Sequence, residues 1–220
     1  GVGPEVLAFL PEHGAMLRRF VPGRVLTAED VRQPGVLGRV VVALRRYHDG
    51  TPGTGCFSPF ATVRQYHALA LEREVPFPTS MERALEQLNC IERELLNERA
   101  PCPCHNDLLP ANFIDDGDAV RIIDWEYAGM GDRFFDLGNL AVNCEFNDEQ
   151  ERFLLELYFG EVHPDDLRRL RLMRLASDMR EAMWGFLQAG AGRSRPPEPP
   201  EYYLAYGNRH LERFLAKRLA

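Results

Sequence analysis

The sequence predicts an α+β fold with a mostly helical body and small β-hairpins. Apolar residues recur at helical spacing along most of the chain beyond residue 134. Two pairs of short apolar segments joined by tight turns, one near the start and one near the middle, are typical of β-hairpins. With 220 residues, of which 45% are hydrophobic, the chain can form one good core or a large and a small lobe.

The first hairpin is expected over residues 6–10 and 15–21, with a Gly-containing turn between them. A Pro-Gly pair ends this hairpin, because neither residue continues a strand readily. We therefore divide the chain into residues 1–22 and a larger, helical unit at residues 23–220.

The larger unit is expected to begin with a helix capped by Thr27, with Asp30 as the acid of a capping box. A Gly- and Pro-rich loop is expected at 49–60 and a Pro-rich connector at 193–200. The two strands of the central hairpin are expected at 112–114 and 120–123. The other helices are expected at 36–47, 61–74, 79–99, 135–143, 147–160, 164–190 and 200–219.

Composition excludes several classes of protein. The net charge of -7 disfavours a nucleic-acid binder, which usually presents a basic face. The five cysteines show no disulfide framework, and Cys102, Cys104 and His105 lack the second ligand pair of a zinc site. No apolar run approaches 18 residues and no signal peptide opens the chain, so we expect a cytoplasmic protein without a membrane span.

The run CHNDLLPANF at residues 104–113 is followed by an apolar strand that ends in Asp124. Phosphoryl transfer from ATP needs a carboxylate that orients the attacking hydroxyl and takes its proton, and oxygen ligands that hold Mg²⁺ on the phosphates. Asp107, Asn112 and Asp124 supply these groups, and their order and spacing match the protein-kinase pattern. The tight hairpin between residues 112 and 124 would bring the two metal ligands together.

The alternative is that these polar residues only form turns between core elements, as Asn and Asp near hairpins usually do. The apolar strand ending in Asp124 at the right distance favours the functional interpretation. His105 is better explained as a buried hydrogen-bonding residue that shapes the loop than as a proton carrier.

The runs HNDLLPANF, IIDWEYAG and FFDLGNLA resemble the choline/ethanolamine kinases, which belong with the aminoglycoside phosphotransferases in the protein-kinase-like superfamily. The resemblance extends from about residue 4 to the end of the chain. It implies a kinase-like helical C-terminal lobe with a catalytic hairpin, with residues 1–22 as the remnant of the N-terminal lobe. It also implies that Asp107 is the catalytic base, that Asn112 and Asp124 bind magnesium, and that Asp136 braces the catalytic loop.

Two features argue against a protein kinase and for a small-molecule acceptor. Leu109 stands where protein kinases usually carry Lys, and the sequence Asp-Trp-Glu-Tyr from Asp124 onward replaces Asp-Phe-Gly. No Ala-Pro-Glu segment follows it.

The resemblance also places aromatic residues of an acceptor pocket at Trp184 and Tyr206. Aromatic faces recognise a quaternary ammonium by cation–π contacts, and Trp125, Glu126 and Tyr127 follow the metal aspartate closely enough to join the pocket wall. Packing in the helical core is an equal alternative for each aromatic residue.

Two positions depart from the eukaryotic choline kinases. Glu181, one helical turn before Trp184, stands where those enzymes carry an aromatic residue, and Asn143 stands where they carry an acid. The acceptor therefore remains open between choline, ethanolamine and, less well matched, an aminoglycoside. A carboxylate at Glu181 would suit a primary amine.

A Gly-rich phosphate loop and a strand lysine are expected in such a kinase, yet the single lysine is Lys217 and the glycines at 50–55 lack the strand-to-helix context. The resemblance starts at the last strands of the small lobe, with Phe20 and Val21 as the hinge that would pair with adenine. Two hypotheses follow: an ATP-dependent kinase whose N-terminal segment precedes this sequence, or an inactive module that binds a cationic small molecule. Oligomeric state is not predicted by the sequence.

Overall fold

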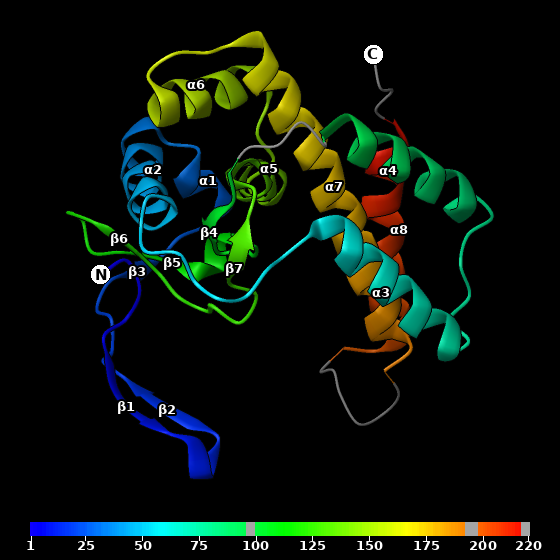
Figure 1. Ribbon diagram of the computed structural model, residues 1–220, viewed down its shortest axis with the longest axis horizontal. Helices are drawn as coiled ribbons and strands as arrows, with labels where there is room; N and C mark the ends of the chain where they lie inside the picture. Colours follow the sequence, from blue (N-terminus) through cyan, green and yellow to red (C-terminus); the bar gives the residue numbers. More distant parts are fainter. Residues whose placement is uncertain (96–99, 192–197, 217–220) are drawn as a thin grey trace.

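A computed structural model describes residues 1–95, 100–191 and 198–216 of the chain (Figure 1). The predicted α+β organisation, with a mostly helical body and two hairpins, is confirmed. In chain order the elements are β1 Val6–Leu10, η1 Pro11–His13, β2 Ala15–Arg18, β3 Arg24–Val25, α1 Ala28–Val31, α2 Pro34–His48, α3 Pro59–Glu72, α4 Met81–Leu95, β4 Cys102–Cys104, η2 Pro110–Asn112, β5 Phe113–Asp115, β6 Val120–Ile122, β7 Gly129–Gly131, α5 Arg133–Asn143, α6 Asp148–Phe159, α7 Pro164–Ala189 and α8 Pro200–Ala216.

The first hairpin, β1–β2, is antiparallel and projects away from the rest of the molecule (Figure 1). Its second strand ends at Arg18, three residues earlier than predicted, and every residue of that strand is exposed. The predicted capping box at Thr27 is present, because the Thr27 and Asp30 side chains each bond the other's backbone N–H.

The long helix α7 runs through the centre of the body, with α5 packed on one side and α3 and α8 on the other (Figure 1). Glycines allow these helices to approach closely. A Cβ on Gly185 of α7 would lie 2.8 Å from the backbone nitrogen of Gly207 in α8, and a Cβ on Gly138 of α5 would lie 2.7 Å from that of Arg174. The α7–α8 and α5–α7 contacts therefore fix the backbone around the site described below.

The central hairpin β5–β6 was predicted within one residue at each strand. Three short strands were missed: β3, which pairs with β5, and the antiparallel pair β4–β7. Each has two or three residues and a partner far away in sequence, so neither periodicity nor a nearby turn indicates it.

The predicted ends of three segments fall outside the described residues: 96–99 of the helix at 79–99, 217–219 of the last helix and 193–197 of the Pro-rich connector. Among the helices of the described residues, none is long and apolar enough to cross a bilayer.

Candidate active site

The loop that follows strand β4 is held by one buried carboxylate. Asp136, in the first turn of α5, accepts hydrogen bonds from the backbone N–H groups of His105 (2.8 Å) and Asn106 (2.7 Å). It also accepts from the Tyr47 hydroxyl and bonds the ring of His48. Burial alone would raise the pKa of the Asp136 carboxyl, but the hydrogen bond and charge of His48, the charge of His105 and the Tyr47 hydroxyl lower it below its usual value.

Two asparagines on the same helix hold the next residue of the loop. The Asn139 side-chain oxygen accepts from the Leu108 backbone N–H (2.5 Å), and the Asn143 amide donates to the Leu108 carbonyl (3.2 Å). Positions 136, 139 and 143 are three and four residues apart, which places them on one face of α5. The sequence analysis missed Asn139. Its position three residues after Asp136 places it on the same helix face, which was the available signal.

His105 is fully buried beneath the loop. Its Nε2 lies 2.9 Å from the carbonyl oxygen of Ile123, its Nδ1 accepts from the Asp107 backbone N–H (3.2 Å), and its ring contacts Trp125 edge-on. The histidine thus links the loop to the segment just before Asp124.

Asn112 and Asp124 lie next to each other at the open end of the central hairpin. The backbone N–H of Ile123 donates to the Asn112 carbonyl (2.9 Å), and the Asn112 side-chain amide donates to the carbonyl of Asp107 (2.9 Å). The Asn112 amide nitrogen is thereby fixed, which leaves its side-chain oxygen for another contact. Asp124 is exposed, has a φ of 64°, and makes no hydrogen bond within the described part of the chain.

These two side chains therefore fit a divalent cation. Mg²⁺ prefers hard oxygen ligands and keeps several waters, so one amide oxygen and one carboxylate suffice to hold it on a phosphate. Neither oxygen is consumed by an internal hydrogen bond. The structure thus brings together the three predicted residues Asp107, Asn112 and Asp124.

A buried arginine touches the candidate base. The Arg180 guanidinium, on α7, donates to Asp107 Oδ1 (2.8 Å) and to the Asn106 carbonyl (3.2 Å), and lies 2.7 Å from Glu181 Oε1. Its side chain is only 2% exposed. Burial would lower the pKa of Arg180, but the charges of Glu181 and Asp107 raise it above its ordinary value, so it stays charged. Sequence analysis missed Arg180, because a further charged residue beside Asp178 and Glu181 in the arginine-rich helix α7 gives no local signal of burial against Asp107.

Asp107 opens onto a cavity of about 370 Å³ between the loop, α7 and α8. Its wall combines aromatic rings with carboxylates. The lining residues are Asp107, Leu109, Glu126, Tyr127, Arg180, Glu181, Trp184, Glu198, Tyr202, Tyr203 and Tyr206. We call this space the acceptor cavity.

Within the acceptor cavity, the Trp184 ring lies edge-on to Tyr203 (5.8 Å) and Tyr206 (5.7 Å). The Tyr206 hydroxyl donates to Glu181 Oε2 (2.8 Å), so both oxygens of Glu181 already face a protein partner, Tyr206 or Arg180. Burial, followed by the charge of Glu181, raises the pKa of Tyr206. Of the carboxylates, Glu126 and Glu198 are exposed at this cavity and carry no such internal pairing.

Two residues predicted for the substrate site lie elsewhere. The Trp125 indole packs against Tyr47 and His105 and donates to the Ile122 carbonyl (2.8 Å), so its ring supports the hairpin from inside. Asn143 lines a different cavity, beyond Leu109, because its side chain turns toward the loop backbone. Both residues lie close to the predicted site in sequence, but their side chains turn away from the acceptor cavity. The sequence does not show the direction in which a side chain points.

Phe20 and Val21, the predicted hinge, follow the protruding hairpin. The Phe20 side chain is 85% exposed and Val21 is half-buried. Their role toward adenine remains a prediction.

Cys102 and Cys104 lie near His48, with candidate ligand atoms within 4.8 Å of one another, whereas His105 points away. Both ring nitrogens of His48 are occupied, by Tyr158 (2.7 Å) and by Asp136 (3.0 Å). Because both nitrogens are occupied, the cluster is explained by packing beneath the loop at residues 104–113.

Comparison with known proteins identifies the family. The model of the phosphotransferase enzyme family matches residues 3–173. The chain belongs to this family. Protein LicA of Haemophilus influenzae is 28% identical over 196 residues, covering 84% of this chain and 73% of that protein. A probable choline kinase of Arabidopsis thaliana is 30% identical over 217 residues, covering 85% of this chain and 62% of that protein.

Comparison with solved structures supports the same family and fold. A choline/ethanolamine kinase family protein from Mesorhizobium loti superposes with a TM-score of 0.87 at 28% identity, over 98% of this chain and 75% of that one. The aminoglycoside phosphotransferase APH(2'')-Ib, at 18% identity and a TM-score of 0.62 over 95% of this chain and 74% of that one, shares the fold. The resemblance inferred from the motifs is confirmed, as is the protein-kinase-like fold. The phosphotransferase spans between about half and three quarters of the length of its curated relatives named LicA.

Proposed function

We propose that this phosphotransferase transfers the γ-phosphoryl group of ATP, with Mg²⁺, to the hydroxyl group of a small cationic amino alcohol such as choline or ethanolamine. The observation that carries the proposal is the position of Asp107. Its backbone carbonyl accepts a hydrogen bond from the Asn112 side chain, and the Asn112 carbonyl accepts one from the backbone N–H of Ile123, the residue before Asp124. Asp107 also lines a cavity of aromatic rings and carboxylates.

Asp107 is the group that orients the acceptor hydroxyl and takes its proton. Arg180 holds one of its oxygens, Oδ1, at 2.8 Å, which leaves Oδ2 to face the hydroxyl. A fixed carboxylate loses less entropy on meeting the substrate, and positioning contributes a large part of the rate of phosphoryl transfer.

Asn112 and Asp124 would hold Mg²⁺ on the nucleotide through their free oxygen atoms. The metal, when bound, neutralises negative charge on the phosphates. Asp136, Asn139 and His105 fix the loop from behind through backbone hydrogen bonds, so that the three polar side chains keep their mutual arrangement.

The acceptor cavity suits a small cation. Trp184 and the surrounding tyrosines present aromatic faces, and each cation–π contact contributes roughly 0.5–2 kcal/mol. Glu126 and Glu198 add negative charge at its edge. A volume of about 370 Å³ favours an amino alcohol over a multi-ring aminoglycoside.

The decisive experiment measures ATP consumption by the protein expressed from its complete gene, with choline, ethanolamine and kanamycin as acceptors. We expect turnover with at least one of the first two. The Asp107→Asn variant is expected to lose about 10²–10⁴-fold in kcat, because general-base assistance is removed. Circular dichroism checks that the variant is folded at the assay temperature, since the buried Arg180 loses a charged partner.

Absence of turnover with choline and ethanolamine would refute the proposed acceptor class. Full activity of Asp107→Asn would refute the role of Asp107. Binding of choline without any ATP consumption would instead support the alternative of a non-catalytic module that binds a cation.

A further inference from the structure

A second cavity, of about 600 Å³, lies on the other side of Tyr206 and Leu109, which line both spaces. Its chemistry is opposite to that of the acceptor cavity. Basic side chains from α7 and α8 dominate its wall, and one carboxylate, Glu145, accompanies them. The basic lining residues are Arg174, Arg209, His210 and Arg213.

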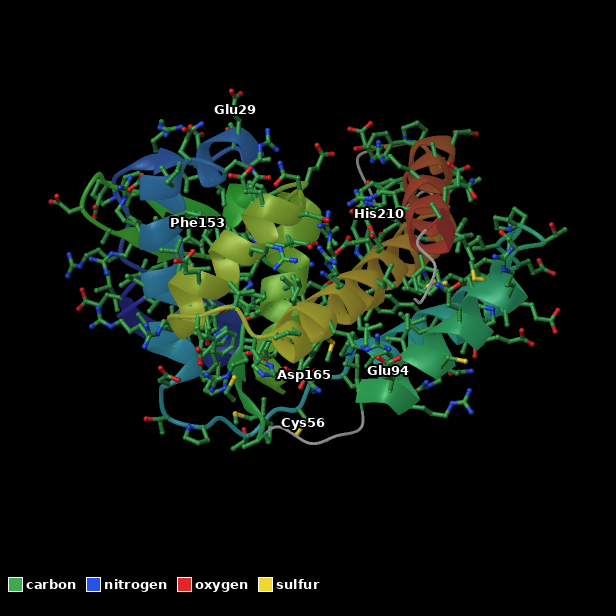
Figure 2. All side chains as sticks on the ribbon, turned by 90° about the horizontal axis from the view of Figure 1, so that it is seen from above. Glu29, Cys56, Glu94, Phe153, Asp165 and His210 are labelled. Atoms are coloured by element: carbon green, nitrogen blue, oxygen red, sulfur yellow. The ribbon has the colours of Figure 1, made fainter. Side chains whose placement is uncertain are left out.

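Arg209 and Arg213 are one helical turn apart on α8, so their charges lie on one face and repel each other. His210 lies on α8 (Figure 2). Its Nδ1 lies 3.0 Å from Asp178 Oδ1, and the Nε of Arg213 lies 3.4 Å from the same oxygen, so Arg213 shares its carboxylate partner. Arg209 forms no ion pair with any carboxylate of the described residues. Its guanidinium lies over the ring of Tyr206, 5.4 Å from the centroid.

Arg174 adds a buried donor to the same wall. Its NH1 bonds Glu151 and the Phe146 carbonyl, but its Nε is buried and has no hydrogen-bond acceptor in the described structure. Glu151 must also serve Arg171, whose Nε lies 2.9 Å away. The acids behind this wall are thus shared between cations, and Arg209 at the cavity has no carboxylate partner among the described residues.

We propose that this second cavity binds an anionic group of the phosphate or carboxylate class, with Arg209 and Arg213 as its principal donors. An anion here relieves the repulsion between the two arginines and gives Arg209 the charged acceptor it lacks. Because Tyr206 and Leu109 separate the two cavities, the anionic group either belongs to an acceptor that also carries the ammonium, or is a separate ion bound next to it.

The test is titration of the protein with inorganic phosphate by calorimetry, without divalent cations. We expect Arg209→Gln to weaken phosphate binding about tenfold or more, since a hydrogen bond to a charged group is lost. Glu145→Gln, which removes the carboxylate that lines the cavity, should strengthen binding by up to about fivefold. Asp124→Asn should leave binding unchanged, which separates this site from the candidate metal site.

Kinetics then distinguish the two sources of the anion. If the acceptor carries it, Arg209→Gln raises KM for a hydroxy amino acid such as serine and leaves KM for ethanolamine unchanged. If it is a separate ion, phosphate binds equally well in the presence of saturating serine, whose carboxylate would otherwise compete for the site. Undetectable binding at millimolar phosphate, or equal affinity of the parent protein and Arg209→Gln with both folded by circular dichroism, would overturn the proposal. These binding results do not depend on turnover, so failure of the proposed reaction would be seen separately.

Discussion

The hairpins β1–β2 and β5–β6 share a local design and differ in their surroundings. Both are antiparallel, both turn through a glycine with positive φ, Gly14 and Gly117, and both were predicted from short apolar segments around a turn. Phe9 of the first hairpin is 65% exposed, whereas Phe113 of the second is completely buried.

The difference comes from what covers each hairpin. Strand β5 pairs with β3 on its outer edge, and β6 contacts helix α2, so β5–β6 is enclosed by elements from other parts of the chain. No described helix packs on β1–β2 in this way, and the hairpin projects outward (Figure 1). Local sequence patterns thus predict strand pairing, while burial depends on segments that the pattern does not contain.

The largest expected difference between the hairpins concerns activity. Asp124 follows the inner hairpin and is a candidate metal ligand, so Asp124→Asn should lower kcat/KM of the protein from its complete gene by at least about 100-fold. Phe20 follows the outer hairpin with a side chain that is 85% exposed, so Phe20→Ala should change kcat/KM only a few-fold. Steady-state kinetics with varied Mg²⁺ measure both, and an equal loss in the two variants would contradict this division.

The same contrast explains how far the sequence could predict the site. Asp107, Asn112 and Asp124 lie within 18 consecutive residues, and a hairpin of short range brings them together, so motif spacing was sufficient. Arg180 meets Asp107 across 73 positions of sequence, and strand β4 meets β7 across more than 20, which no local pattern reports. The direction of the Trp125 ring depends on its contact with Tyr47, which is also far away in sequence, so it could not be predicted from a local pattern.

Truncating the two phenylalanines tests burial directly. Phe113→Ala should lower the free energy of unfolding by about 3–5 kcal/mol, because it removes a buried ring and leaves a cavity. At this chain length that corresponds to a fall of roughly 6–20 °C in Tm. Phe9→Ala is the matched control and should change stability by less than about 0.5 kcal/mol. Thermal unfolding followed by circular dichroism compares them, and a large effect of Phe9→Ala would mean that the outer hairpin is covered in solution.

A smaller difference is expected between the ion pairs of the two hairpins. Arg39 binds Asp115 of β5 with two hydrogen bonds, 2.5 Å and 3.1 Å, and the Asp115 side chain is 7% exposed. Arg19 binds Glu5 beside β1 at 2.6 Å, with both side chains more than 60% exposed. Asp115→Asn should cost about 1–2 kcal/mol, because two charge-assisted hydrogen bonds to a largely buried carboxylate are weakened, although Arg39 itself is 31% exposed. Glu5→Gln should cost less than about 0.5 kcal/mol, as exposed pairs do.

The pH dependence of the Asp115→Asn effect sharpens this comparison. The hydrogen bond from Arg39, which outweighs the opposing effect of burial, holds the pKa of the Asp115 carboxyl below its usual value. The stabilisation is therefore fully present above the unfolded-state pKa of about 3.9 and is lost as the pH falls through the folded-state pKa. Urea unfolding at several pH values should show the cost of Asp115→Asn shrinking below about pH 4. A cost that stays constant down to pH 2 would mean that Asp115→Asn disturbs packing and does not remove a charge interaction, because the Asn oxygen can still accept the turn hydrogen bond from the Gly117 N–H.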